Sequence, residues 1–286
     1  MKISIVIPVY NERKSVEDII NRIKTVMKKS NYDYEIIVVD DCSMDNSYQI
    51  LQKISDIKLI RNKSNSGYSA SLKKGINESK GEYIIITDAD GTYLPESIPS
   101  LLKYFKEYDM VVGAREKGNV PLLRKPAKAF ISLLANILVN KRIPDINSGL
   151  RIFNKKLFVE FYHLFPEGFS FTTTITLACL TNNYSVKYIR IPYEKRKGKS
   201  SIKPIKDFVG FTSLIVRIMT YFKPLKMFSL VSGFLILIGI LILIYSGLIK
   251  GKVLDLTVTV IFLTAIQILI LGLIADLIVK ERKRKW

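Results

Sequence analysis

Residues 82–90 read EYIIITDAD, an apolar run that ends in two aspartates one residue apart. Such a run is typical of a buried strand, and α/β proteins bind ligands at the carboxyl ends of their strands. Asp88 and Asp90 could hold a hard divalent cation, Mg²⁺ or Mn²⁺, whose other ligands are diphosphate oxygens and water. Most D-x-D triplets are only solvated loop acids, so the position after a strand is what makes this pair a candidate site.

Strand-like and helix-like runs alternate from residue 2 to about residue 191, which predicts an α/β domain with parallel strands. The expected strands are 3–7, 35–40, 58–60, 83–87 and 110–112, and the expected helices are 15–29, 45–54, 69–79 and 96–108. Polar or flexible residues follow four of the strands, so we expect four strand ends to form one crevice. Besides the two aspartates, these residues are Asn11, Glu12, Asp40, Asp41, Gly113 and Arg115.

Asp40 and Asp41 close the second expected strand. A carboxylate at this position could accept the imide or amide N–H of a uracil or guanine ring. It could equally cap the next helix, a role that we assign to Asp45. The small residues around Gly67 either allow a backbone to approach a ligand or mark a loop ahead of a helix.

Two long apolar stretches lie near the C-terminus: residues 228–249 carry no charge, and residues 256–279 carry only Asp276. At about 1.5 Å per residue, each reaches across the roughly 30 Å of a bilayer core. We therefore predict two transmembrane helices. Asp276 precedes Lys280 by four residues, which predicts a structural ion pair at the membrane boundary and not a proton relay.

The flanking charges predict the orientation of this hairpin. The tail 280–286 carries five basic residues, whereas the loop between the spans has only Lys250 and Lys252. No signal-like run opens the sequence, so we expect the N-terminal part to stay in the cytosol. Both termini would then be cytoplasmic, on the cell membrane or an ER-type membrane.

Two shorter stretches have a helical apolar rhythm. Residues 127–140 predict an amphipathic helix, for which ordinary core packing is an equal alternative, and residues 204–223 predict a helix in the bilayer interface. The expected organisation is a catalytic domain over 1–203, the interfacial helix over 204–223, spans over 228–249 and 256–279, and a basic tail over 280–286.

The net charge of +19 suits either a nucleic acid or an anionic membrane. Each Lys or Arg beside an anionic leaflet contributes about 1 kcal/mol. The basic residues are scattered through the first 200 positions and gather beside the apolar stretches, without clusters of stacking aromatics, so we predict no nucleic-acid partner. Cys42 and Cys179 are too few for a disulfide framework, and the single histidine, His163, cannot build a His-rich metal site.

In order and spacing, these motifs resemble glycosyltransferase family 2 on the GT-A fold, and specifically the dolichyl- or polyprenyl-phosphate sugar synthases. The matching motifs are Pro8-Val-Tyr-Asn-Glu12, Val39-Asp-Asp41 with Ser43 and Asp45, Gly67 with Ala70, Asp88-Ala-Asp90, Gly113-Ala-Arg115, Asp145 with Ser148-Gly149 and Arg151, and Arg196-Lys-Gly198-Lys-Ser-Ser201. The resemblance implies a Rossmann-like mixed sheet, followed by interfacial amphipathic helices and a two-helix transmembrane hairpin.

The resemblance also implies roles for particular residues. Those expected at the nucleotide are Pro8, Tyr10, Glu12, Asp40, Asp41, Asn65, Gly67, Asp88, Ala89 and Asp90, with the metal on Asp88 and Asp90. Those expected at the lipid phosphate or acceptor are Arg115, Arg124, Lys128, Ser148, Arg151, Arg196, Ser200 and Lys203. Catalytic roles fall to Asp88, Asp90, Arg115, Arg124 and Arg196, since guanidinium groups bind phosphate bidentately and keep their charge.

Two departures from the family pattern concern the donor and the metal. Mannose-transferring members usually place Gln two residues beyond the second aspartate, whereas Gly91, Thr92 and Tyr93 follow Asp90 here. This difference puts the third protein ligand of the metal in doubt. Ser201 also stands where many members have Lys, and the nearest lysine is Lys203. Both departures weaken a mannose assignment, so UDP-glucose is favoured slightly over GDP-mannose.

The expected activity is an inverting, metal-dependent transfer of a hexose from a nucleotide-sugar to dolichyl or polyprenyl phosphate. A related transferase with a glycan or another lipid as acceptor is the nearest alternative. A processive synthase would carry a Q-x-x-R-W motif, which is absent, because Trp286 is the only tryptophan. A non-catalytic nucleotide-binding membrane scaffold is a further alternative, and a homo-oligomer is compatible with the sequence.

Overall fold

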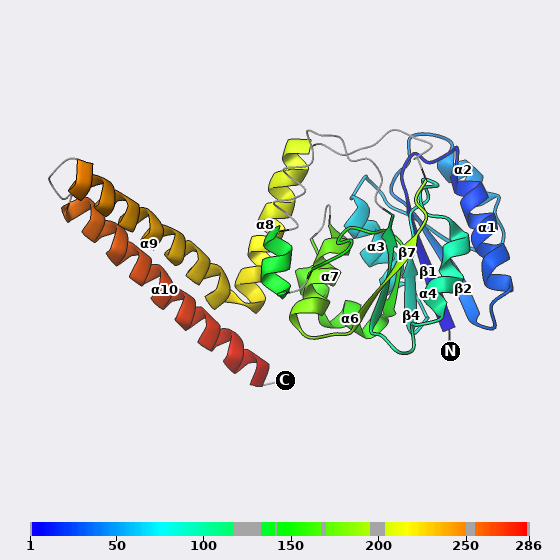
Figure 1. The fold of residues 1–286 in the computed structure, drawn as a ribbon. Helices are drawn as coiled ribbons and strands as arrows, with labels where there is room; N and C mark the ends of the chain where they lie inside the picture. Colours follow the sequence, from blue (N-terminus) through cyan, green and yellow to red (C-terminus); the bar gives the residue numbers. More distant parts are fainter. Residues whose placement is uncertain are drawn as a thin grey trace. The chain divides into compact units, whose positions relative to one another are not determined.

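The computed structural model describes residues 2–116, 133–140, 142–166, 170–194, 204–249 and 255–284 (Figure 1). The chain divides into two compact units, Met1–Phe211 and Thr212–Trp286. The first unit is an α/β domain, and the second is dominated by two long helices.

A seven-stranded mixed sheet forms the centre of the first unit. Its strand order is β3-β2-β1-β4-β6-β5-β7, and β6 is antiparallel to both of its neighbours. The strands are β1 Lys2–Val9, β2 Asp33–Asp40, β3 Lys58–Arg61, β4 Tyr83–Ile86, β5 Met110–Arg115, β6 Arg151–Asn154 and β7 Val186–Ile191. The five predicted strands are confirmed, and the carboxyl ends of all strands except β6 meet at one edge.

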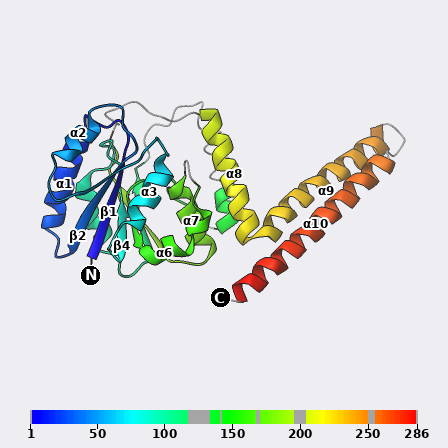
Figure 2. The same cartoon turned by 180° about the vertical axis from the view of Figure 1, so that it is seen from behind.

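Helices cover both faces of this sheet (Figure 1, Figure 2). The helices of the first part of the chain are α1 Val16–Lys28, α2 Ser47–Gln52, α3 Tyr68–Asn77, the 3-10 turn η1 Pro95–Ser97 and α4 Ile98–Leu102. They are followed by a helix over 133–139, α6 Lys155–Glu160, the 3-10 turn η3 Tyr162–Leu164, α7 Phe171–Thr181 and α8 Pro204–Phe222.

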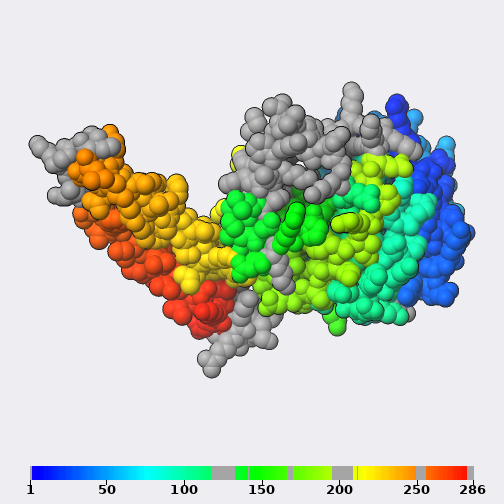
Figure 3. Space-filling model, viewed as in Figure 1, coloured from blue at the N-terminus to red at the C-terminus, as the bar shows by residue number. Residues whose placement is uncertain are grey.

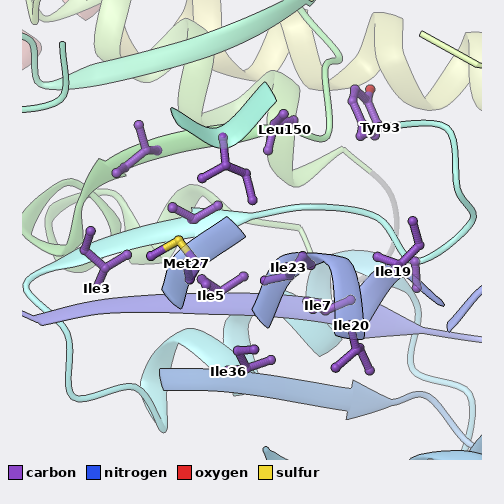
Figure 4. Close-up of a cluster of buried hydrophobic side chains, with 14 of the residues drawn as sticks. Ile3, Ile5, Ile7, Ile19, Ile20, Ile23, Met27, Ile36, Tyr93 and Leu150 are labelled. Carbon is purple, nitrogen blue, oxygen red and sulfur yellow. The ribbon is translucent and has the colours of Figure 1, made fainter. Parts of the chain in front are cut away.

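The larger core lies between β1, β2 and α1. Ile3, Ile5 and Ile7 point to the face of the sheet on which α1 lies, because side chains alternate along a strand. Ile20 and Ile23 of α1 pack against them (Figure 4), and the same cluster includes Ile98, Leu101 and Leu102 of α4. The apolar positions of α1 recur every three or four residues, so burial of that stripe fixes the helix on the sheet.

The opposite face of the sheet carries α3 and α7. Gly75 of α3 lies so close to β1 and β2 that an added Cβ would clash with Val6, and would also stand 3.1 Å from Val39 Cγ2. A glycine is therefore needed at position 75 for α3 to pack this closely on β1 and β2. This close packing brings the start of α3 to the carboxyl ends of β2 and β4.

Several segments differ from the sequence-based expectation. The helix expected over 96–108 is a 3-10 turn followed by five α-helical residues and then turns. Pro99 has no backbone N–H, so a regular helical hydrogen bond to residue 95 cannot form. The antiparallel strand β6 and the buried helix α7 were not among the expected elements.

The second unit contains α9 Pro224–Ile249 and α10 Asp255–Arg284, which lie side by side and antiparallel (Figure 1, Figure 3). Within them, Pro224–Leu248 and Leu256–Glu281 are long and apolar enough to cross a membrane. The second range contains the predicted span 256–279, and the first covers all of the predicted span 228–249 except Ile249. The predicted ion pair also forms, with Lys280 Nζ 2.9 Å from Asp276 Oδ2.

Candidate active site

The ends of β1 and β2 are joined by hydrogen bonds through their following loops. Asn11 adopts a positive φ of 56°, a conformation that Asn tolerates well. Its amide donates to Ser43 Oγ at 3.0 Å, and its side-chain oxygen accepts from the Met44 amide at 2.8 Å. The Glu12 amide donates to Ser47 Oγ at 2.9 Å. The two predicted ligand loops are therefore held together.

Asp45 completes this junction. Its Oδ1 accepts from the Ser47 amide at 2.9 Å, and Ser47 is the first residue of α2. Its Oδ2 accepts from the Arg13 amide at 3.3 Å. The N-cap residue of α2 is thus Asn46 and not Asp45, which the sequence predicted, but Asp45 satisfies the Ser47 backbone donor and also binds the β1–α1 loop.

Asp40 ends β2 and is completely buried. Its Oδ2 lies 3.3 Å from Arg61 Nε and accepts from the Ser43 amide at 3.3 Å. Its Oδ1 is buried and has no hydrogen-bond partner among the residues that the structure describes. Because an unsatisfied buried acceptor is costly, this oxygen is suited to an N–H from a bound molecule.

Asp41 directly follows β2 and binds the loop before α3. Its Oδ1 accepts from Asn62 Nδ2 at 2.7 Å and from the Ser66 amide at 2.8 Å, while Oδ2 accepts from the Gly67 amide at 2.8 Å. Protein donors thus engage both oxygens. Asp41 shapes the loop before α3, where Gly67 has a φ of 91°, and its contact with the nucleotide stays a prediction.

Asp88 follows β4 and is fixed from two sides. Tyr68, the first residue of α3, donates its hydroxyl to Asp88 Oδ1 at 2.9 Å. Burial, followed by the charge of Asp88, raises the pKa of Tyr68 well above its ordinary value, so this hydroxyl keeps its proton. On the other side lies Gly149, where an added Cβ would stand 2.5 Å from Asp88 Oδ2.

Asp90 is buried in the same loop. Its Oδ1 accepts from the Thr92 amide at 3.0 Å and from Thr92 Oγ1 at 2.6 Å. Gly91, between Asp90 and Thr92, has a φ of 79°. Ser15, just before α1, donates to the Ala89 carbonyl at 2.7 Å. The two aspartates are therefore held on one rigid loop, at the carboxyl edge of the sheet.

The donor set at this loop fits a hard cation in part. Two carboxylates supply the oxygen ligands that Mg²⁺ or Mn²⁺ prefer. Among the residues described, no group of three or more His, Cys, Asp or Glu side chains could hold a metal. The remaining coordination positions would therefore belong to water and to a ligand such as a diphosphate.

Arg115 ends β5 and forms a bidentate pair with Asp145. The Nε–Oδ2 distance is 2.7 Å and the Nη2–Oδ1 distance is 2.8 Å. Burial opposes ionisation of Asp145, but the hydrogen bonds and charge of Arg115 outweigh it and lower the pKa of Asp145. The guanidinium also lies 5.2 Å from the centre of the Tyr193 ring. Arg115 is thus at the predicted edge, held by a carboxylate.

Two predicted acceptor residues do not reach a ligand surface. Arg151 is completely buried and donates to the carbonyls of Ser148 and Thr172, at 3.1 Å from Nε and 3.0 Å from Nη1, and to Thr176 Oγ1 at 2.8 Å. Ser148 is also fully buried, and its hydroxyl donates to the Gly113 carbonyl at 2.5 Å. The structure therefore contradicts an acceptor role for both. Arg151 joins β6 to α7, and Ser148 joins the segment before β6 to β5.

The other predicted site residues fall into two groups. Pro8 and Ala89 are buried, Glu12 is largely buried, and Tyr10 and Asn65 are exposed. Five predicted residues lie outside the described residues, as do residues 127–132 of the amphipathic stretch 127–140. They are Arg124, Lys128, Arg196, Ser200 and Lys203.

Three site residues were missed from the sequence: Arg61, Tyr68 and Tyr93. Arg61 ends β3, so the strand-end argument that selected Asp40 would have found it. Tyr93 is buried, and its hydroxyl accepts from the Gly149 amide at 2.7 Å. Tyr68 directly follows Gly67 in the sequence. No sequence signal pairs either tyrosine with a residue beyond its own loop, since Gly149 and Asp88 come from distant segments.

A mixed sheet with an acidic D-x-D loop at its carboxyl edge defines a glycosyltransferase of the GT-A fold. A family model described as glycosyl transferase family 2 matches residues 4–161, more than half of the chain. A second model, the GtrB C-terminal hairpin, matches residues 223–280. The chain belongs to glycosyltransferase family 2.

Relatives with assigned functions transfer sugars to lipid phosphates, according to their names. A dolichol-phosphate mannosyltransferase from Pyrococcus furiosus is 32% identical over 235 residues, which are 77% of this chain and 64% of that protein. The aligned part is thus less than two thirds of that relative. An undecaprenyl-phosphate 4-deoxy-4-formamido-L-arabinose transferase from Yersinia pestis is 29% identical over 83% of this chain and 73% of its own.

Solved structures share the fold. Glucosyl-3-phosphoglycerate synthase from Mycobacterium tuberculosis, in complex with Mn²⁺, UDP and glucosyl-3-phosphoglycerate, has a TM-score of 0.59 at 15% identity, over 76% of this chain and 78% of that one. Residues 1–349 of S. aureus TarS, in complex with UDP-GlcNAc, have a TM-score of 0.57 at 21% identity, over 78% and 68% of the two chains. At these identities the likeness concerns the fold alone.

Proposed function

We propose that this glycosyltransferase transfers a hexose from a nucleoside-diphosphate sugar to dolichyl or polyprenyl phosphate, with inversion at the anomeric carbon. The observation that carries the proposal is the loop Asp88-Ala-Asp90, fixed by Tyr68, Thr92 and Ser15. At the same edge of the sheet lies the buried Asp40 Oδ1, which has no hydrogen-bond partner among the described residues. This arrangement offers oxygen ligands for a diphosphate-bound cation and an acceptor for a base N–H. The named acceptors of two relatives support the choice of a lipid phosphate.

Asp88 and Asp90 would hold Mg²⁺ or Mn²⁺ together with the donor diphosphate. When bound, the cation neutralises charge on the leaving nucleoside diphosphate. A structural neighbour was solved with Mn²⁺ and UDP, which supports a divalent cation in this fold. The chain's own part is to fix both carboxylates before the donor binds, so that little reorganisation is needed during the reaction.

In the proposed reaction, an oxygen of the lipid phosphate attacks the anomeric carbon and forms the new C–O bond. The bond from that carbon to the diphosphate oxygen breaks on the opposite face, and the nucleoside diphosphate leaves with the electron pair. A phosphomonoester has a second pKa of about 6, so it is already a nucleophilic anion at neutral pH. Positioning and electrostatics therefore suffice, without a histidine base.

The donor base would meet Asp40. Its Oδ1, which has no partner among the described residues, can accept from the imide of uracil or from the N–H of guanine, while Oδ2 pairs with Arg61. Both bases therefore satisfy this contact. We place UDP-glucose first, because the segment after Asp90 departs from the mannose-type pattern, and GDP-mannose second.

Arg115 belongs to the proposed acceptor side, with its orientation set by Asp145. Arg124, Lys128, Arg196, Ser200 and Lys203 remain predicted acceptor ligands on sequence grounds. Arg151 and Ser148 are not part of this proposal, because their donors are already used inside the protein.

We further propose that α9 and α10 span a membrane, with both termini in the cytoplasm, and that α8 lies at its surface. The two apolar ranges and the match to a hairpin family support this placement. A C-terminal GFP fusion in Escherichia coli should fluoresce and a C-terminal alkaline phosphatase fusion should be inactive. The reverse pattern would contradict the orientation.

The proposal predicts release of nucleoside diphosphate that depends on added lipid phosphate. The full chain, solubilised in detergent with Mn²⁺ or Mg²⁺, should release it with one donor among UDP-glucose, GDP-mannose, UDP-GlcNAc and UDP-galactose. Asp90→Ala should abolish release while leaving the protein folded. Release without lipid phosphate would indicate another acceptor, and nucleotide binding without release from any donor would indicate a scaffold.

A further inference from the structure

Gln267 is a polar side chain near the middle of the apolar range Leu256–Glu281 of α10. It is exposed on the hairpin and forms no hydrogen bond with any residue that the structure describes. In water this exposure would cost nothing. In the proposed transmembrane hairpin, the same amide would lie at the centre of the hydrocarbon layer.

The helix α9 covers a different face of α10. Ala265 is completely buried, and its carbonyl accepts from Ser232 Oγ of α9 at 2.8 Å. At Gly272 an added Cβ would stand 2.6 Å from Phe228 Cβ of α9. Gln267 is two residues beyond Ala265, which places it roughly 200° around the helix. It therefore points away from α9.

An amide in hydrocarbon without a partner is unfavourable by several kcal/mol, because lipid tails offer neither donors nor acceptors. Polar side chains in spanning helices therefore usually face another helix, where they form interhelical hydrogen bonds. The position of Gln267 thus indicates that a further helix packs on the face of α10 opposite α9.

The residues around Gln267 form a seam suited to such a helix. Their spacing alternates between four and three residues, as in a left-handed helix pair. The seam consists of Val260, Thr264, Gln267, Leu271 and Ile274. All five are exposed on the hairpin. One polar residue within an otherwise mostly apolar seam is a feature that fixes register in paired helices.

We propose that a second copy of this chain packs its α10 against this seam, with the two Gln267 amides hydrogen-bonded to each other. A glutamine amide carries both donors and an acceptor, so it is complementary to itself. A two-fold axis along the membrane normal places both amides at the same depth. It also brings the seam of one copy against the same seam of the other copy. The proposal rests on the proposed membrane insertion, and it does not depend on the identity of donor or acceptor.

Cysteine crosslinking in membranes of cells that express the full chain tests this arrangement. Leu271→Cys should give disulfide-linked dimers on oxidation with copper phenanthroline, and Gln267→Cys should give them in lower yield, because it removes the amide pair. Ile266→Cys is the matched control, because this exposed residue has nearly the same depth and lies about 100° away. The parent chain, with its native Cys42 and Cys179, gives the background. A dimer yield that is highest at 271, lower but above background at 267, and near background at 266 is expected.

Energy transfer between labelled copies in proteoliposomes gives a second measurement. Gln267→Leu should weaken association about 3- to 30-fold, and Gln267→Asn should retain part of it. Equal crosslinking at 266 and 267, or background yield at 267 and 271, would overturn the proposal. Loss of the parent chain from the membrane pellet after alkaline carbonate washing would instead contradict membrane insertion. Neither assay requires sugar transfer, so failure of the proposed reaction would be recognised separately.

Discussion

At the scale of single residues, the position of Asp88 depends on a glycine from another part of the chain. Gly149 lies just before β6, which pairs with β4 in antiparallel register, with Ile86 opposite Arg151. Sheet pairing thus brings the Gly149 backbone against the Asp88 carboxylate and the Tyr93 ring. The carboxylate can rotate away from an added methyl group, whereas the backbone cannot.

Gly149→Ala should therefore leave the protein folded but move Asp88. An added Cβ would stand 2.5 Å from Asp88 Oδ2 and 2.9 Å from Tyr93 Cε2. Misplacing a reacting group by about 1 Å can reduce turnover by about 100-fold. We expect a loss of that order in initial rate, with a nearly unchanged Tm. Gly247→Ala is the control, because no atom lies within 4 Å of its added Cβ. Equal activity in the two variants would contradict this role of Gly149.

Tyr68 acts on the same carboxylate by a hydrogen bond. Partners that orient a metal-binding carboxylate typically contribute 10- to 100-fold to metal affinity or activity. Tyr68→Phe should therefore weaken Mn²⁺ binding in the presence of UDP by about 10-fold, measured by electron paramagnetic resonance. Tyr184→Phe also removes a hydroxyl donated to a carboxylate, that of Glu160 at 2.5 Å, and it should have no effect. Wild-type Mn²⁺ affinity in Tyr68→Phe would show that Tyr68 does not position the site.

At the scale of elements, the pair of Arg115 and Asp145 joins β5 to the segment before β6. The folded-state pKa of Asp145 is lowered, so its contribution to stability is present above the unfolded pKa of about 3.9 and is lost as the pH falls through the folded value. At neutral pH, Asp145→Asn should reduce stability by about 2 kcal/mol, because Arg115 loses an ionised partner.

The difference in apparent Tm between the wild type and Asp145→Asn should therefore be large at about pH 7 and shrink below about pH 4. Thermal unfolding of the detergent-solubilised chain, followed by circular dichroism, measures it. A difference that grows on acidification would contradict an ionised Asp145 in the folded protein.

The elements also differ in how well the sequence predicted them. The first five strands and α1 follow from local patterns, since apolar runs and a three-to-four-residue rhythm reflect burial on one face. In α7, a run rich in threonine favours strands by local preference. It is nevertheless helical because tertiary packing outweighs the local preference: almost every residue is buried, and the Thr176 hydroxyl is satisfied within the helix by the Thr172 carbonyl at 2.7 Å.

The site was predictable to the extent that it follows strand ends. Asp40, Asp88, Asp90 and Arg115 all lie where the strand-end argument placed them. Sequence alone could not separate Asp40 from Asp41, because the difference is which oxygens are already bonded within the protein. Arg151 shows the same limit: its charge suggested a phosphate, but its strand position points it into the space between the sheet and α7.

At the scale of the whole molecule, the chain combines an α/β unit that carries a candidate nucleotide-sugar site with a unit of two long apolar helices. Lipid phosphates are confined to membranes, so anchoring the enzyme would limit its search for the acceptor to the membrane surface. The account therefore predicts that the two substrates enter from different phases: the donor from water and the acceptor from lipid.

The most direct test of this account is mass spectrometry of the lipid product. The full chain is incubated with UDP-glucose or GDP-mannose, a divalent cation and a short polyprenyl phosphate, beside the Asp90→Ala variant. The account predicts that the polyprenyl phosphate gains one hexose with the wild-type chain only, and that the nucleoside diphosphate appears in equal amount. The account would be contradicted by consumption of the donor with the lipid left unmodified. It would also be contradicted if Asp90→Ala formed as much hexosylated lipid as the wild type.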